Sequence, residues 1–298
     1  MEQIKKLKKK ISTLLSYTIG KIRVATLLYY LTLAVLGGVF IFSSAYLINY
    51  WVDSRQASSD YNDLASRLES LRATVPTQTE PADPSPRPTR PSTSETMATE
   101  PQPTGPQILP EYEPFYELNN DMVGWITIKD TKINYPVMQT PDDPDYYLKR
   151  SFYKMESDWG SIYAREVCDI NKPSDNITLY GHHMKDASMF AQLTKFQYKD
   201  FWQSHQTFTF DTLYERHTYK IWAVFKASAD YGDDYFGYHR FVDAATEEEF
   251  AEFVKNVKDL DFYDTGITPV YGDKLLTLST CEYSLDNGRF VVCAVRVS

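Results

Sequence analysis

A cysteine and an arginine near the C-terminus have side chains suited to covalent chemistry. Cys281 ends the apolar run KLLTLSTC, and Arg289 follows the turn sequence Asp286-Asn287-Gly288. These patterns predict a β-hairpin with Cys281 and Arg289 on either side of its tip. A thiolate is a nucleophile, and a nearby guanidinium stabilises the charge of a thiolate or an oxyanion. The alternative is a buried core cysteine beside a surface arginine.

A cysteine nucleophile also needs a proton acceptor, and histidine is the usual one. Three of the five histidines lie in polar or Tyr/Gly-rich segments, which predict surface positions: His205, His217 and His239. His182 and His183 instead end the apolar strand NITLYGHHM, where Gly181 allows a sharp turn. Neighbours on an extended chain face opposite sides, so at most one of the two is expected to meet Cys281. A paired-histidine metal site is disfavoured for the same reason.

The N-terminal residues predict a membrane anchor. Residues 1–23 hold seven Lys or Arg against one Glu, and residues 24–51 hold no charged residue. A bilayer core requires about 20 apolar residues, and the apolar part of a cleaved signal peptide is usually about 7 to 15 residues long. An uncleaved span is therefore favoured over a signal peptide. The positive-inside rule predicts a single-pass cell-membrane protein with residues 1–23 in the cytoplasm and everything after Asp53 extracytoplasmic.

Charge and cysteine content restrict what the rest of the chain can do. The whole protein has a net charge of −9, and no basic stripe follows the basic first 23 residues. Nucleic acid and other anionic polymers are therefore not expected as ligands. The three cysteines are few for a disulfide framework, and the odd count leaves at least one thiol free. Whether Cys168 and Cys293 form a bridge stays open.

Residues 52–107 are expected to connect the anchor to a folded domain. Leucines at helical spacing between residues 53 and 75 are compatible with a short helix, but the polar composition favours a solvated stalk. Ten prolines among Thr, Ser, Gln and Glu follow between residues 76 and 110. Such a composition cannot form a packed core and favours an extended polyproline II spacer.

The sequence of residues 108–298 predicts one mostly β domain, whose size is within the range that a single hydrophobic core supports. A short helix is expected near residues 112–119, and a helical insertion near residues 188–196. The regular spacing of short strand-like runs indicates a closed antiparallel barrel or a sandwich. The sequence contains eight such runs: 124–128, 132–137, 160–164, 176–180, 207–210, 217–227, 275–281 and 289–297.

A longer helix is predicted just before the final hairpin, over residues 246–260. Thr246 and Glu249 form a capping box at its start. The apolar residues that follow lie on a single helical stripe: Phe250, Phe253, Val254 and Val257. This stripe predicts packing on the barrel wall rather than a catalytic role.

Three motifs in this domain resemble those of a known enzyme family. LYGHHM, TLSTC and GRFVV, in that order, resemble the His, Cys and Arg signatures of the sortases, membrane-anchored cysteine transpeptidases of Gram-positive bacteria. FYELNNDMVGWITI, YYLKRSFYKMESDWGSIYA and the long helix resemble class B sortases in particular. The resemblance covers the domain from about Ile108. It implies a closed sortase-type β-barrel with His182, Cys281 and Arg289 as catalytic residues, and His183 in a variable place.

The resemblance also implies a reaction. The Cys281 thiolate attacks a threonine carbonyl in a sorting signal near the C-terminus of a secreted surface protein, which gives a thioacyl enzyme. His182 acts as general acid and then as general base, and Arg289 stabilises the oxyanion. An amine of a lipid-linked cell-wall precursor or a pilin lysine then accepts the acyl group. Ser279 shares a strand face with Cys281 and is expected to line the peptide groove, with an ordinary strand hydroxyl as the alternative.

Two other functions stay open at this point. One is a Cys/His peptidoglycan peptidase or transpeptidase that acts on wall peptides instead of protein tails. The other is a non-catalytic surface domain that binds a partner through its many tyrosines. No cofactor or metal is expected, because the sequence has no glycine-rich phosphate loop and no clustered metal-ligand spacing.

Overall fold

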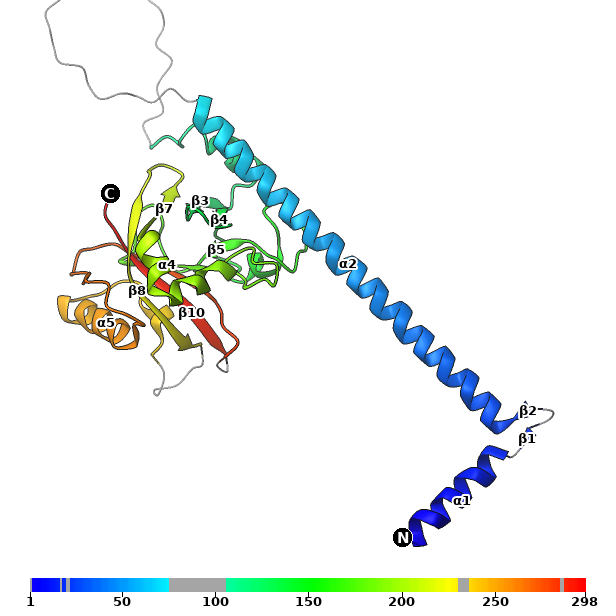
Figure 1. Ribbon diagram of the computed structural model, residues 1–298. Coiled ribbons are helices and arrows are strands. Elements are labelled where there is room, and N and C mark those ends of the chain that lie inside the picture. Colours follow the sequence, from blue (N-terminus) through cyan, green and yellow to red (C-terminus); the bar gives the residue numbers. More distant parts are fainter. Residues whose placement is uncertain (1, 17, 20–21, 75–105, 230–235, 285–286) are drawn as a thin grey trace, which may run out of the picture. The chain divides into compact units, whose positions relative to one another are not determined.

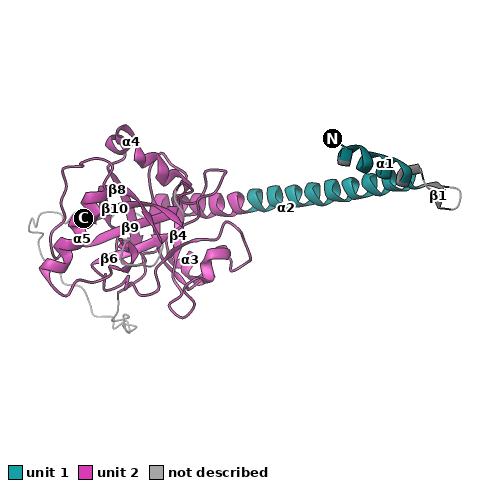
Figure 2. Ribbon diagram, turned by 90° about the horizontal axis from the view of Figure 1, so that it is seen from below, with its two compact units in different colours: residues 1–56 teal, residues 57–298 magenta. Residues whose placement is uncertain are grey.

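The computed structural model describes residues 2–16, 18–19, 22–74, 106–229, 236–284 and 287–298 (Figure 1). The chain divides into two compact units, residues 1–56 and residues 57–298 (Figure 2). The Pro-rich spacer expected up to residue 107 lies almost wholly outside the described residues.

The N-terminal unit contains the uncharged run found in the sequence. Its elements are α1 (Glu2–Ser16), β1 (Thr18–Ile19), β2 (Ile22–Arg23) and the first half of α2 (Val24–Thr74). Large apolar side chains project from this part of α2, and Phe40 and Phe42 are 73% and 75% exposed. Such exposure is unfavourable in water and suits contact with lipid. By length and composition, α2 can cross a bilayer.

The second unit is built around a closed barrel of eight strands. Neighbouring strands follow the order β10-β8-β7-β3-β4-β5-β6-β9, and β9 pairs with β10 to close the barrel. The strands are β3 (Met122–Thr127), β4 (Asn134–Met138), β5 (Ile162–Ala164), β6 (Asn176–Tyr180), β7 (Thr207–Thr212), β8 (Thr218–Ser228), β9 (Leu275–Cys281) and β10 (Gly288–Arg296). All eight strand-like runs form strands, so the closed, mostly β barrel is confirmed.

Two of the eight pairings are parallel, which the expectation of an antiparallel barrel did not include. β4 pairs in parallel with β5, and β6 pairs in parallel with β9. Parallel neighbours need a crossover connection, and the chain makes a long excursion between the members of each pair. The β6–β9 pairing has a direct consequence for the site, because the carboxyl ends of both strands lie at the same end of the barrel.

Short helices and the helix α5 (Glu247–Leu260) also lie outside the barrel. The short ones are α3 (Glu113–Leu118), α4 (Lys199–Ser204) and the 3₁₀ helices η1 (Tyr146–Lys149), η2 (Ala191–Gln197) and η3 (Tyr238–Arg240). Helix α5 starts as predicted, with the Thr246 hydroxyl accepting a hydrogen bond from Glu249 N at 3.3 Å. Its apolar stripe is buried in one cluster with Trp222 and Phe225 of β8, which confirms packing on the barrel wall.

Residues 57–74 of α2 belong to the barrel unit, which corrects the solvated stalk expected for residues 53–75. Tyr61, Leu64 and Leu68 are at most 5% exposed. The Tyr61 hydroxyl donates to the Gly160 carbonyl at 2.6 Å and lies 3.0 Å from Ser161 Oγ. A stripe of only a few apolar residues did not distinguish this packed helix from a stalk, because the surface that covers the stripe is formed by distant parts of the chain.

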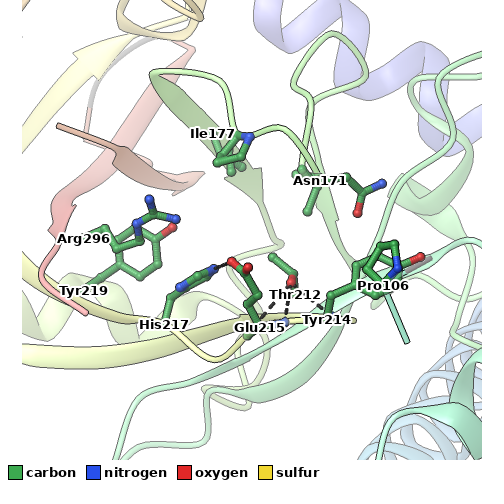
Figure 3. Close-up of a pocket in the computed structure, with 11 residues that line it drawn as sticks. Pro106, Asn171, Ile177, Thr212, Tyr214, Glu215, His217, Tyr219 and Arg296 are labelled. Atoms are coloured by element: carbon green, nitrogen blue, oxygen red, sulfur yellow. Dashed lines mark hydrogen bonds and ion pairs between the residues drawn. The ribbon is translucent and has the colours of Figure 1, made fainter. Parts of the chain in front are cut away.

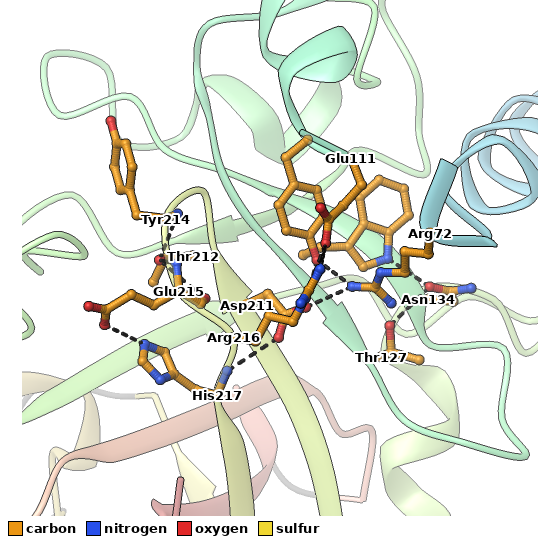
Figure 4. A network of polar contacts seen from close by, with 12 residues as sticks. Arg72, Glu111, Thr127, Asn134, Asp211, Thr212, Tyr214, Glu215, Arg216 and His217 are labelled. Carbon is orange, nitrogen blue, oxygen red and sulfur yellow. Dashed lines mark hydrogen bonds and ion pairs between the residues drawn. The ribbon is translucent and has the colours of Figure 1, made fainter. Parts of the chain in front are cut away.

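The C-terminal end of α2 is also held by charge (Figure 4). Arg72 donates to the carboxylate of Asp211 on β7 at 2.7 Å, and the Tyr112 hydroxyl donates to the same oxygen at 2.7 Å. Burial raises the pKa of Tyr112, and the Asp211 carboxylate raises it further. A second pair, Arg216 and Glu111, lies beside this group. Because Asp211 is buried, removal of Arg72 would leave its carboxylate charge without an ion-pair partner and would substantially lower the stability of the fold.

Candidate active site

Three strand ends meet at one rim of the barrel. β6 ends at Tyr180, beside Ser279 of the parallel strand β9. β10 starts at Gly288, and its Arg289 lies opposite Cys281 across the antiparallel β9–β10 pair. The residues that follow β6, end β9 and begin β10 therefore share this rim.

Cys281 and Arg289 form a non-hydrogen-bonded pair. Glu282 N donates to the Gly288 carbonyl at 2.8 Å, so the neighbouring pair carries the hydrogen bonds, and the two kinds of pair alternate. Side chains approach most closely in non-hydrogen-bonded pairs, with Cβ atoms about 4.5–5.5 Å apart. The Arg289 guanidinium can therefore reach the surroundings of the sulfur. Its Nη1 donates to the Asn287 and Gly288 carbonyls at 3.1 and 3.0 Å.

The rim opens into a pocket of about 590 Å³. All four residues singled out in the sequence line it: His182, Ser279, Cys281 and Arg289. Charged groups of both signs stand around it, namely Asp145, Arg165 and Glu166. A thiol, an imidazole and a guanidinium on one pocket are the groups that acyl transfer through a thioester requires.

The other two cysteines are buried, and their thiols are poor nucleophiles. Cys168 and Cys293 are free thiols, so the bridge left open by the sequence is not formed. Burial raises the pKa of Cys168, and it raises the pKa of Cys293 to about 12. Both therefore stay protonated near neutral pH, and Cys281 is the one thiol that is partly exposed.

His182 reaches the pocket because Gly181 lets the backbone pack closely. A Cβ atom at Gly181 would lie 2.5 Å from Ile162 Cδ1 and 2.7 Å from Phe190 Cγ, so a larger residue would displace the end of β6. The Nε2 atom of His182 is 2.6 Å from the Leu148 carbonyl. A carbonyl only accepts hydrogen bonds, so Nε2 carries a proton in this arrangement.

His183 is oriented differently from its neighbour. Its Nδ1 atom is 2.9 Å from the main-chain carbonyl of Cys281. Its ring lies beside Tyr283, with the ring centroids 5.4 Å apart. The two histidines thus have separate partners, as expected for neighbours on an extended segment, but both lie close to the cysteine strand.

Ser279 is one of the residues that form the wall of the pocket. It is 1% exposed, and its Oγ atom is 2.7 Å from the Tyr238 hydroxyl, which belongs to a second residue lining the pocket. Burial raises the pKa of Tyr238 to about 12, so the phenol remains a neutral hydrogen-bonding group. The Ser279 hydroxyl is therefore already hydrogen-bonded to Tyr238 in the pocket wall.

Two further pocket residues were not identified from the sequence. Thr280 lines the pocket, and its Oγ1 atom is buried and has no hydrogen-bond partner among the described residues. His239 was expected at the surface, but it lines the pocket. Burial lowers the pKa of His239, and the Arg165 guanidinium lowers it further. For Thr280 the only signal in the sequence was its position next to Cys281.

A second pocket, of about 350 Å³, lies where β10 ends at Arg296 (Figure 3). His217 Nε2 lies 3.3 Å from Glu215 Oε2 in it. Arg289 and Arg296 mark the two ends of β10, so the two pockets occupy opposite ends of the strand. None of the three cysteines lines the second pocket. The second pocket therefore offers no thiol.

Comparisons with known proteins agree on one family. A family model described as Sortase domain matches residues 126–297. Sortase B of Listeria monocytogenes is 34% identical over 189 residues, which cover 62% of this chain and 74% of that protein. A Bacillus anthracis protein described as similar to sortase B has a TM-score of 0.64 and 28% identity, covering 82% of this chain and 96% of that one. A Staphylococcus aureus sortase B–substrate complex shares the fold, with a TM-score of 0.66 and 22% identity over 83% of this chain and 99% of that one.

These similarities are extensive enough to assign the family. The family model covers more than half of the chain, and nearly three quarters of the Listeria protein is matched. The chain therefore belongs to the sortase family of cysteine transpeptidases. Within that family it is a class B sortase, the class named for its relatives in both sequence and structure.

Proposed function

We propose that this sortase cleaves a C-terminal sorting signal of secreted surface proteins after a threonine and transfers the acyl group to an amine. The observation that supports this reaction is the position of His182, Cys281 and Arg289 around one pocket. The pocket, of about 590 Å³, has room for several peptide residues. The amine belongs to a lipid-linked cell-wall precursor or to a pilin lysine.

The enzyme works from the outer face of the cell membrane. The uncharged half of α2 is the anchor, and the basic residues before it remain in the cytoplasm. The barrel is then extracytoplasmic, where secreted substrates emerge from the membrane. Residues 57–74, at the end of the same helix, pack against the other residues of the barrel unit.

Each of the three residues has a defined step. The Cys281 thiolate attacks the threonine carbonyl, and the peptide C–N bond breaks as protonated His182 gives its proton to the leaving amine and becomes neutral. The product is a thioester. In the second half His182 takes a proton from the incoming amine, whose nitrogen attacks the thioester carbonyl and expels the Cys281 thiolate. Arg289 donates to the oxyanion of both tetrahedral intermediates.

Substitution of Arg289 separates charge from geometry. Arg289→Ala is expected to lower kcat/KM for acylation about 10²- to 10³-fold, because the oxyanion loses its donor. Arg289→Lys should recover only part of this loss, since an ammonium does not reproduce the planar guanidinium fork. The rate of thioester formation would be measured for each variant, with thermal melting as the control for folding. Wild-type rates in Arg289→Ala would remove the residue from the mechanism.

The full chain in detergent micelles allows a direct test of the proposed reaction. The resemblance to class B sortases favours a sorting signal of the form Asn-Pro-Xaa-Thr-Xaa. Incubation with a pool of such peptides should add to Cys281 an acyl group that ends at threonine. Intact-mass and peptide mass spectrometry would detect the adduct. Addition of triglycine or a lysine peptide should remove it and yield the transfer product. If wall stem peptides acylate Cys281 and the pool does not, the protein is instead a wall peptidase.

A further inference from the structure

The carbonyl of Cys281 is held by a side chain instead of by the barrel's main-chain ladder. Cys281 is the last residue of β9, and its main-chain carbonyl is 2.9 Å from His183 Nδ1. Because a carbonyl only accepts, Nδ1 carries the proton and donates it. The same Nδ1–H donates whether the ring is neutral or protonated.

The pattern of the ladder shows why a side chain is needed at this point. Cys281 and Arg289 form a non-hydrogen-bonded pair, so the Cys281 carbonyl faces away from β10 and toward β6. On that side the parallel ladder reaches Gly181 N, which donates to the Ser279 carbonyl at 3.2 Å. One step further, a regular ladder would use the main-chain N–H of residue 183 for the Cys281 carbonyl. β6 has ended by then, and the His183 imidazole supplies the hydrogen bond.

A second contact ties His183 to the segment that follows the cysteine. The Tyr283 hydroxyl donates to the His183 carbonyl at 3.3 Å, and the two rings lie side by side. His183 is therefore bound through its ring to Cys281 and through its main chain to Tyr283. Both contacts span the point where β9 leaves the barrel, and His183 does not line the pocket itself.

We propose that His183 is a positioning residue for the nucleophile: its Nδ1–H holds the Cys281 carbonyl and so fixes the direction of the sulfur. This inference rests on the proposed function, because it takes Cys281 as the reacting group. His183 exchanges no proton with substrate. It acts by keeping the end of β9 in the ladder geometry, so that the Cys281 side chain stays on the pocket side, beside Arg289.

Two substitutions of His183, one that keeps a hydrogen-bond donor and one that does not, distinguish the effect of the hydrogen bond from the effect of side-chain volume. In His183→Asn the side-chain Nδ2 occupies the place of the imidazole Nδ1, two bonds beyond Cβ, and still donates. His183→Leu fills similar space without a donor. We expect His183→Leu to lower kcat for acylation by the peptide pool about tenfold with KM changed less than about twofold, because small misplacements of a reacting group are costly. His183→Asn should stay within about threefold of wild type.

His205 offers a matched control elsewhere in the domain. Its Nδ1 also lies 2.9 Å from a main-chain carbonyl, that of Phe201, and it does not line the pocket. His205→Leu should leave kcat and KM of the full chain in micelles unchanged. Equal losses in His205→Leu and His183→Leu would show a general effect of histidine removal and would overturn the proposal.

The tautomer of His183 provides a readout that does not depend on activity. Long-range ¹H–¹⁵N spectra of histidine-labelled wild-type protein, assigned with His183→Asn, should show the proton on Nδ1. A proton on Nε2 alone, or a His183→Asn variant as slow as His183→Leu, contradicts the positioning role. A wild-type protein with the proton on Nδ1 but no acylation by any sorting-type peptide would instead count against the proposed function.

Discussion

Cys281→Ala is expected to abolish the acyl-enzyme and to lower transfer by more than about 10³-fold, because the substitution removes the nucleophile itself. The other two thiols do not replace it, since both are buried away from the pocket with pKa values raised by burial. Peptide binding should persist, because the pocket walls and Arg289 remain. Mass spectrometry would follow the adduct, and fluorescence anisotropy of a labelled peptide would follow binding.

Cys168→Ala serves as the matched control for this experiment. Cys168 is 4% exposed, and its thiol is 3.6 Å from the Asn176 carbonyl, outside the site. This variant should form the acyl-enzyme at the wild-type rate per folded molecule. An adduct that persists in Cys281→Ala and disappears in Cys168→Ala would reverse the assignment of the nucleophile.

Removal of the second half of α2 is expected to have the largest effect on stability. A chain starting at residue 57 keeps the packed helix, whereas a chain starting at residue 108, the boundary predicted from sequence, loses Tyr61, Leu64 and Leu68 from the core. Each buried leucine is worth about 2–5 kcal/mol by truncation to alanine. Their sum is comparable with the total stability of a domain, about 5–15 kcal/mol.

The shorter chain should therefore be unfolded, or should melt more than about 10 °C below residues 57–298. Circular dichroism melts of the two fragments would show the difference. Within residues 57–298, the double variant Leu64→Ala/Leu68→Ala should reproduce most of the loss. Glu69→Ala, at an exposed position on the same helix, should change the melting temperature little. Equal melting of both fragments would mean that α2 adds nothing to the domain.

Local pattern was sufficient for the parts of the fold that depend on neighbours in the chain. The eight strand runs, the capping box of α5 and its apolar stripe all appear in the structure as predicted. Cys281 and Arg289 could be paired in advance because one hairpin joins them, and hairpin register follows from the turn. The His motif could be selected for its glycine and its apolar strand. Its distance from the cysteine could not be known.

Contacts between distant segments were outside the reach of local pattern. Thr280 and His239 carry no signal of their own, yet both line the pocket. The helical stripe of residues 57–74 is too short to indicate burial until the barrel provides a surface to cover it. Sequence patterns assigned His183 no role of its own. Its hydrogen bond to the Cys281 carbonyl depends on the residue at which the main-chain pairing of β6 with β9 ends.

The sequence by itself determined which residues can react, which segments are strands and which stretch is apolar enough to cross a membrane. These properties reside in side-chain chemistry and in the period of the backbone. Only the tertiary structure decided that β6 lies parallel to β9, and this pairing brings His182 to the rim where Cys281 and Arg289 stand. The choice of strand neighbours minimises exposed apolar surface and unpaired main-chain groups over the whole barrel, so no single segment contains it.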